Sequence, residues 1–284
     1  MLFTHEYITN RIIRIKDISL TAMYLVIGDH TTALLDTGIG IGNVREYIRN
    51  EIGKEVDLLI LTHGHLDHAS GAILFKDIPV YLNELDRDLM NRHVFDILSH
   101  VTYTEDMYRR LNMVCPEYSQ ADILEGYDSC HTLPLEDGDA FDLGGITLEA
   151  IHTPGHTQGM TMILFKEERI ILFGDACGVG VLLVEDCCST VEVYRNTLIH
   201  VKSYEGEYDR IIRNHGTCES PLSLLQNVID VCADILNGTD DHIPSSAPIA
   251  TDYPVFMAKE TLPGTQTRVD GKEGNIIYAA NKIR

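Results

Sequence analysis

The sequence is short of positive charge. Lysine and arginine together number 22 against 43 aspartates and glutamates, so the 284 residues carry a formal net charge of -21. A protein this acidic repels phosphate backbones, and the composition therefore disfavours nucleic-acid binding. A nuclease would need a local basic groove, which the overall charge neither predicts nor excludes.

The sequence also lacks the patterns of secreted and membrane proteins. Its seven cysteines include no C-x-x-C spacing, and their odd number predicts reduced thiols rather than a disulfide framework. The N-terminus has neither the basic nor the apolar segment of a secretory signal. No apolar run approaches the roughly 20 residues that span a bilayer. We therefore expect a cytoplasmic protein with no membrane partner.

Apolar residues are abundant, at 44%, which allows a substantial core, and the length suits one large domain or two small ones. Apolar runs rich in strand formers alternate with segments of helical spacing, which predicts an α/β fold. Strands are expected within residues 11–36, 56–61, 79–82, 131–151, 162–173, 210–214 and 275–278. Helices are expected at 41–52, 69–75, 190–206 and from 221 to 236. The two hairpin-rich halves, 11–82 and 131–215, would each supply one sheet.

The densest polar cluster is Thr62-His63-Gly64-His65-Leu66-Asp67-His68, directly after the apolar run 56–61. A loop at the end of a buried strand is where an α/β scaffold usually presents its chemistry. Imidazole and carboxylate ligands suit zinc, iron or manganese, and the absence of thiolate argues against a purely structural zinc site. The alternative is a surface loop that happens to be rich in histidine.

Further polar residues follow later strands. His156 comes after the stiff turn Thr153-Pro154-Gly155, which can aim one imidazole. Asp175 and His215 each stand just beyond an apolar strand, and Asp36 begins the turn Asp-Thr-Gly after an earlier one. For the two aspartates, ordinary turn or helix-cap chemistry is the alternative interpretation.

The motif H-x-H-x-D-H, with the later residues in this order, resembles the signature of the metallo-β-lactamase fold superfamily, in particular its glyoxalase II and lactonase-like branch. The resemblance covers about residues 11–216. It implies an α/β fold, a four-layer αβ/βα sandwich with metals at the sheet edge. We expect a single domain over residues 1–284, with a helical insert at 83–129 as a candidate substrate lid near the active site and a C-terminal helix and tail at 220–284.

The resemblance also implies a set of metal ligands. Three histidines would hold one ion, two histidines and an aspartate the other, and one aspartate would bridge them. In that order they are His63, His65 and His156; Asp67, His68 and His215; and Asp175. Asp36 would orient a ligand histidine through a hydrogen bond. Asp67 would also be catalytic, carrying a proton to the leaving group.

A nitrogen and oxygen site with a bridging carboxylate suits two zinc ions, with iron or manganese as alternatives. Two ions that share a water lower its pKa from about 15.7 to about 7, and the resulting hydroxide would cleave an ester, thioester, lactone or amide bond. Two alternatives stay open: an oxidoreductase similar to the persulfide dioxygenases, with one iron, and a phosphodiesterase. We expect a small-molecule substrate and leave self-association into a homo-oligomer open.

Some residues have no clear assignment. Lactonases of the superfamily carry a tyrosine soon after the bridging aspartate, and here none follows Asp175. Three tyrosines could replace it from elsewhere, namely Tyr103, Tyr108 and Tyr194. His93 and His100 lie in the insert without a spacing motif, so they are expected to be packed or to face solvent. His152, before the Thr-Pro-Gly turn, is expected to be structural.

Overall fold

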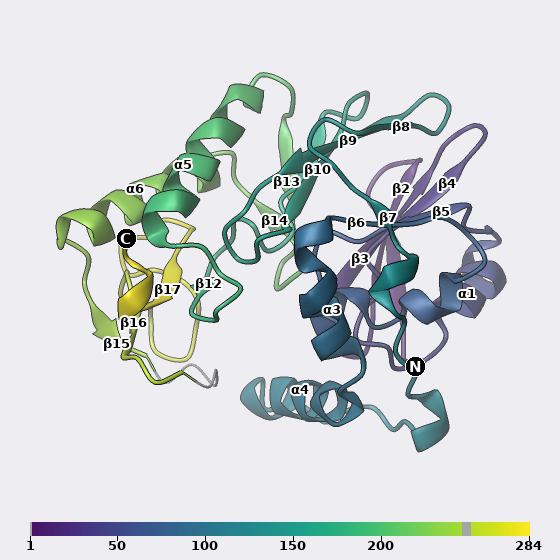
Figure 1. Ribbon diagram of the computed structural model, residues 1–284, viewed down its shortest axis with the longest axis horizontal. Coiled ribbons are helices and arrows are strands. Elements are labelled where there is room, and N and C mark those ends of the chain that lie inside the picture. The colour runs from purple at the N-terminus through teal and green to yellow at the C-terminus, as the bar shows by residue number, and fades with distance from the viewer. Residues whose placement is uncertain (1, 246–250) are drawn as a thin grey trace. The chain divides into compact units, whose positions relative to one another are not determined.

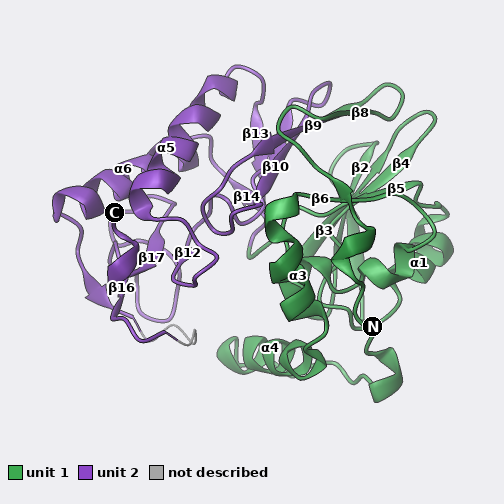
Figure 2. Ribbon diagram, viewed as in Figure 1, with its two compact units in different colours: residues 1–148, 214–216 green, residues 149–213, 217–284 purple. Residues whose placement is uncertain are grey.

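A computed structural model of the chain describes residues 2–245 and 251–284 (Figure 1). Residues 246–250 of the expected tail, and Met1, lie outside the described residues. The chain forms two compact units, residues 1–148 with 214–216 (unit 1) and residues 149–213 with 217–284 (unit 2) (Figure 2). Both combine sheets with helices, which confirms the mixed α/β class. The single domain over 1–284 stays a prediction.

Unit 1 is built on a seven-stranded sheet whose strands are hydrogen-bonded in chain order. They are β1 (Thr4–Tyr7), β2 (Ile12–Lys16), β3 (Ala22–Ile27), β4 (Thr32–Leu35), β5 (Leu58–Ile60), β6 (Val80–Leu82) and β7 (Leu133–Pro134). The first four pair antiparallel, whereas β4, β5, β6 and β7 run parallel. Parallel strands end at the same edge, so Asp36 after β4 and the histidine segment after β5 come together.

The strand β7 corrects one expectation. The sequence predicts that residues 131–215 form the second sheet. β7 lies in this range, yet it pairs in parallel with β6 and so extends the first sheet. The following strand, β8 (Ala140–Asp142), also falls in unit 1. The chain therefore leaves unit 1 only after residue 148.

The helices of unit 1 are short. They are α1 (Val44–Tyr47), which continues as a π-helical turn over Ile48–Ile52, α2 (Leu66–Ala69), α3 (Arg87–Val94) and α4 (Ile97–Arg110). The helix expected at 69–75 begins earlier, because the carbonyl of His65 accepts from the N–H groups of His68 and Ala69. A separate 3-10 turn, Ala72–Phe75, follows after Gly71.

The expected insert, residues 83–129, contains α3 and α4. Buried residues four apart, His100, Thr104 and Tyr108, give α4 one packed face. The second helical piece expected up to Pro116 already ends at Arg110, and Val114 beyond it is exposed. Only short 3-10 turns follow in this segment, at Gln120–Asp122 and Ser129–His131.

Unit 2 contains most of the second sheet, whose order is β14-β13-β11-β10-β9-β8. Besides β8, its strands are β9 (Thr147–His152, in unit 2 from Glu149), β10 (Thr161–Phe165), β11 (Ile170–Leu172), β13 (Arg210–Ile212) and β14 (Glu219–Ser220). The helices α5 (Val191–Val201) and α6 (Leu224–Asn237) lie side by side (Figure 1). Their apolar faces join strand residues such as Leu164 and Ile171 in one buried cluster, which is the core of this unit.

The third sheet of the structure, which lies in unit 2, was not expected from the sequence. It joins β12 (Val181–Leu183), β17 (Ile276–Ala279), β16 (Val255–Met257) and β15 (Ile243–Pro244), in that order. β12 pairs in parallel with β17, so the end of the tail is tied to the segment soon after Asp175. The tail, which had no assigned role, therefore supports the part of the chain that follows a predicted ligand.

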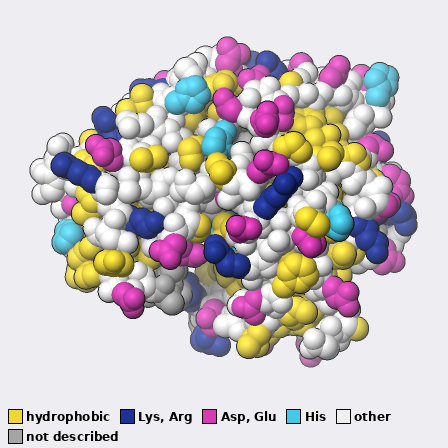
Figure 3. All heavy atoms as spheres, viewed as in Figure 1, with side chains coloured by type: hydrophobic (Ala, Val, Ile, Leu, Met, Phe, Trp, Pro, Cys, Tyr) yellow, Lys and Arg dark blue, Asp and Glu magenta, His cyan; other side chains and the backbone are white. Residues whose placement is uncertain are grey.

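The surface agrees with the composition. On the face drawn in Figure 3, lysine and arginine side chains are dispersed among acidic and apolar ones.

All seven cysteines are free thiols. Within residues 2–245 and 251–284, no helix has both the length and the apolar character needed to cross a bilayer.

Candidate metal centre

Unit 1 holds five of the seven predicted ligands. The buried strand β5 ends just before Thr62. His63 and His65 follow, His65 in extended backbone, and α2 carries Asp67 and His68. The fifth, His215, lies in the segment 214–216, which belongs to the same unit. Four of the five are buried, and His215 is partly exposed.

The ligand atoms of these five residues face one another. The two Nε2 atoms of His68 and His215 are 3.2 Å apart, and Nε2 of His63 is 3.1 Å from Nδ1 of His65. Oδ2 of Asp67 lies 3.4 Å from Nε2 of His215. Two ligands on one tetrahedral zinc, with bonds of about 2.0–2.1 Å, stand about 3.3 Å apart. The residues therefore fit a metal ion, which would replace close nitrogen pairs by two bonds to one cation.

Asp36 organises the back of this cluster. Its Oδ2 accepts hydrogen bonds from Nδ1 of His68, Oγ1 of Thr62 and Nδ2 of Asn214, each at 2.9 Å. Its Oδ1 accepts from the backbone N–H of Thr62 at 2.7 Å. Because Nδ1 of His68 donates to Asp36, the lone pair of its Nε2 is left for the site. Asp36 is completely buried and has a φ of 64°, a strained region that is enriched at functional sites.

Gly64 is required by close packing. Its N–H donates to Oδ2 of Asp86 at 3.0 Å. A Cβ at this position would lie 2.7 Å from the carbonyl oxygen of Asp86 and 2.9 Å from the backbone nitrogen of Met90. Both are backbone atoms at the start of the insert, so they cannot move aside as a flexible side chain would. The position between His63 and His65 therefore requires a glycine.

We expect Gly64→Ala to displace His63 and His65 and to weaken metal binding and hydrolysis. A misplacement of about 1 Å can cost on the order of 100-fold in activity. Zinc titration and initial rates on the same preparation measure the effect. Gly206→Ala is the matched control, since a Cβ there meets nothing within 4 Å. Unchanged zinc affinity in Gly64→Ala would show that the segment tolerates the shift.

A second buried carboxyl, Asp17, lies behind Asp67. Its Oδ1 accepts from Oγ of Ser19 at 2.7 Å, and Oγ1 of Thr21 donates to Oδ2 of Asp67 at 3.2 Å. Burial raises the pKa of Asp17 to about 6. Between about pH 4 and pH 6, Asp17 is therefore protonated in the folded protein and ionised in the unfolded chain. Burial of Asp17 consequently costs stability above about pH 6 and not below about pH 4.

Besides Asp86, other residues of the insert contact the histidine segment or Ser70 just after it. Tyr103 of α4 donates through Oη to Oδ2 of Asp67 at 2.8 Å. The His93 ring stacks on that of His65, with centroids 5.2 Å apart and an interplanar angle of 15°. His100 Nε2 lies 3.2 Å from Oγ of Ser70. Of the two expected alternatives, packed or facing solvent, His93 and His100 show the first, and they pack beside predicted ligands.

The other two tyrosines considered from the sequence make different contacts, although Tyr103 also packs against the apolar cluster of Tyr108. Tyr108 is buried in an apolar cluster with Ile18, Ile39 and Ile41. In unit 2, Tyr194 donates its hydroxyl to the carbonyl of Ala176 at 2.6 Å, and burial raises its pKa well above the usual value. Of the three, Tyr103 is the one that reaches a predicted ligand.

Unit 2 brings the remaining two predicted ligands together. Nε2 of His156 is 3.7 Å from Oδ2 of Asp175. Nδ1 of His156 lies 3.0 Å from the carbonyl oxygen of Leu182 in β12, and donation there leaves Nε2 as the ligand atom. His152 places Nε2 2.8 Å from the carbonyl of Gln158, which ties the two ends of the loop together as a structural residue would. Completion of the centre of unit 1 by His156 and Asp175 stays a prediction.

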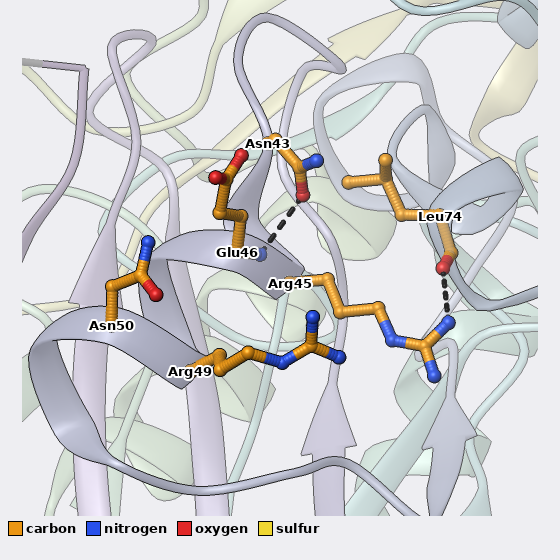
Figure 4. A pocket seen from close by; sticks show the side chains of 6 residues that line it. All are labelled: Asn43, Arg45, Glu46, Arg49, Asn50 and Leu74. Atoms are coloured by element: carbon orange, nitrogen blue, oxygen red, sulfur yellow. Dashed lines mark hydrogen bonds between the residues drawn. The ribbon is translucent and has the colours of Figure 1, made fainter.

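A surface pocket of about 300 Å³ lies away from these residues (Figure 4). Asn43, Arg45, Glu46, Arg49, Asn50 and Leu74 line it. Its two arginines already pair with carboxylates, Arg45 with Asp77 and Arg49 with Glu55. None of the lining residues belongs to the predicted ligand set, so the chemistry is assigned to the histidine cluster.

Comparison with known proteins identifies relatives of this chain. The model of the family described as "Metallo-beta-lactamase superfamily" matches residues 18–208. The human protein named acyl-coenzyme A thioesterase MBLAC2 is 25% identical over 219 residues, which are 72% of this chain and 67% of the relative. An Aspergillus chevalieri protein named atrochrysone carboxyl ACP thioesterase is 26% identical over 204 residues, 68% of this chain and 53% of the relative.

Solved structures share the fold. The metallo-beta-lactamase from Pontibacter korlensis aligns with a TM-score of 0.57 at 15% identity, covering 82% of this chain and 99% of that one. At this level of identity the likeness concerns the fold alone. It agrees with the mixed sheets and helices described above.

Proposed function

Since the chain belongs to the metallo-β-lactamase superfamily and is a metal-dependent hydrolase, we propose that it cleaves a thioester, or a related acyl bond of a small molecule, at a dinuclear zinc centre. The observation that carries the proposal is the facing pair of Nε2 atoms of His68 and His215. Asp67, His68 and His215 together offer ligand atoms within 4.8 Å of one another. Neutral imidazoles and carboxylates at this spacing suit zinc, and iron and manganese are the alternatives.

The proposed ligand set is the one that the family resemblance implies. One ion would be held by three histidines, the other by an aspartate and two histidines, and one aspartate would be shared. In that order they are His63, His65 and His156; Asp67, His68 and His215; and Asp175. The pairing of Nε2 of His156 with Oδ2 of Asp175 at 3.7 Å supports their joint role.

When bound, two such ions would lower the pKa of a shared water from about 15.7 to about 7 and polarise the scissile carbonyl. Asp36 keeps Nε2 of His68 directed at the site by accepting from its Nδ1. The backbone carbonyl of Leu182 does the same for Nε2 of His156. We assign Asp67 the transfer of the proton to the leaving group, because its carboxylate lies among the ligands and is already hydrogen-bonded.

The substrate class rests on the relatives. The names of the human and Aspergillus chevalieri proteins both specify a thioester, in one case of coenzyme A and in the other of an acyl carrier protein. The chain spans 67% and 53% of their lengths, so their activities come to this chain only as a proposal. The insert at 83–129, which contacts the histidine segment, is the candidate lid over the acyl group.

We expect the purified protein to contain about two zinc ions per chain and to hydrolyse an acyl-coenzyme A. Release of the free thiol, followed with a thiol reagent, measures the rate, and elemental analysis of the same sample measures the metal. A nitrophenyl ester, a lactone and bis-nitrophenyl phosphate complete the panel. Removal of metal with a chelator should abolish turnover, and zinc should restore it.

The alternatives give different results in the same panel. One iron per chain with oxygen uptake would support the oxidoreductase similar to the persulfide dioxygenases and contradict the hydrolase. Turnover of bis-nitrophenyl phosphate without turnover of acyl substrates would support a phosphodiesterase. The net charge of -21 disfavours a nucleic-acid substrate in that case.

A further inference from the structure

The side chain of Asp67 has two donors on one oxygen. Oη of Tyr103 donates to Oδ2 at 2.8 Å and Oγ1 of Thr21 donates to the same atom at 3.2 Å. Thr21 comes from the segment before β3, whereas Tyr103 comes from α4 in the insert. The carboxylate is therefore held between the central sheet and the insert, on two elements far apart in the sequence.

Tyr103 is well placed to hold that contact. It lies on the same helix as His100 and Tyr108, which are buried and fix α4 against unit 1. Three residues before Tyr103, Nε2 of His100 approaches Oγ of Ser70, and Ser70 follows α2. The helix that carries Tyr103 is thus anchored to the helix that carries Asp67, so the hydroxyl has little freedom to leave the carboxylate.

From this geometry we infer that Tyr103 is a positioning residue of the metal centre, so that α4 of the insert is a working part of the site. The inference rests on the proposed function, because it concerns Asp67 as a ligand. The hydrogen bonds to Oδ2, which is also the oxygen 3.4 Å from Nε2 of His215, fix the rotation of the carboxylate group and thereby the direction in which it faces a cation. The insert then affects metal binding as well as access of substrate.

The test removes the single oxygen atom of the tyrosine hydroxyl. We expect Tyr103→Phe to fold normally and to bind zinc about 10-fold more weakly, at the lower end of the range for outer partners of metal ligands. The lower end applies because Thr21 still donates to the same oxygen. At saturating zinc, kcat should fall while KM stays near that of the wild type. The matched control is Tyr108→Phe, on the same helix but buried in the apolar cluster.

A double-mutant cycle separates positioning from general packing. If Tyr103 acts through Asp67, its hydroxyl should matter little for zinc affinity once Asp67 has been replaced by alanine. We therefore expect Tyr103→Phe to cost about 10-fold in the wild type and almost nothing in the Asp67→Ala background. An equal loss in both backgrounds would mean that the hydroxyl only stabilises α4 and would overturn the inference.

Failure of this inference is distinct from failure of the proposed function. Wild-type protein that binds two zinc ions and cleaves acyl-coenzyme A, with Tyr103→Phe unchanged in zinc affinity and kcat, refutes the role of Tyr103 alone. Wild-type protein that binds no zinc refutes the metal centre itself, and the positioning role falls with it.

Discussion

Replacing His65 with alanine is expected to remove zinc binding and hydrolysis together. The buried His65 places Nδ1 3.1 Å from Nε2 of His63. Replacing it with alanine removes the proposed ligand nitrogen next to His63. Loss of an outer partner of a metal ligand already costs about 10–100-fold, and loss of the ligand itself should exceed that. Asp175→Ala should behave in the same way, since the shared carboxylate would be absent.

Zinc per chain and the rate of acyl-coenzyme A hydrolysis should be measured on one preparation of each variant. His131→Ala is the matched control, because that histidine is exposed and lies outside the ligand set. Circular dichroism shows whether each variant is folded. Full activity in either His65→Ala or Asp175→Ala would refute the assignment of the site.

The second large effect is expected at Asp36. Asparagine keeps the size of the side chain and tolerates the φ of 64°, so Asp36→Asn tests the acceptor role with little added backbone strain. Oδ2 of the carboxylate accepts from His68, Thr62 and Asn214, and Oδ1 accepts from the backbone N–H of Thr62. An amide has one acceptor oxygen, so its NH2 group must face a donor on one of these two sides. We expect zinc affinity to fall by about 10–100-fold, together with a loss of thermal stability.

The control for this variant is Asp57→Asn. Asp57 also accepts a backbone N–H, that of Thr32, but it is exposed and lies at the other end of the strand pair β4 and β5. Zinc titration and thermal unfolding with and without zinc compare the two. Zinc affinity in Asp36→Asn equal to that of the wild type would show that Asp36 does not orient His68.

The local part of the site could be predicted from the sequence. Four chemically competent side chains within six residues must lie near one another wherever the chain goes, and the apolar strand before them set their place at a sheet end. The position of Asp36 behind them is implied by the resemblance of Asp36-Thr37-Gly38 to the Asp-Thr-Gly of the superfamily. Its four hydrogen bonds give that prediction a physical basis, although its effect on metal binding is still to be measured.

The contacts between distant segments could not be predicted. Tyr103 is 36 residues from Asp67, Thr21 is 46 residues away, and Asn214 is 178 residues from Asp36. No spacing rule relates such pairs, because each depends on how the insert or the returning chain packs on the sheet. The sheet formed by β12, β17, β16 and β15 could not be predicted for another reason. β15 and β16 are two and three residues long and only partly buried, so their sequences show no alternation of apolar and polar residues.

The segment 214–216 has a consequence for how the protein can be divided. It belongs to unit 1, although residues 149–213 before it and 217–284 after it belong to unit 2. During synthesis, Asn214 and His215 are therefore added only after the 65 residues 149–213 of unit 2. Any fragment that stops at residue 148 lacks the partner of His68 and one of the donors to Asp36. Such a fragment therefore lacks part of the proposed metal centre.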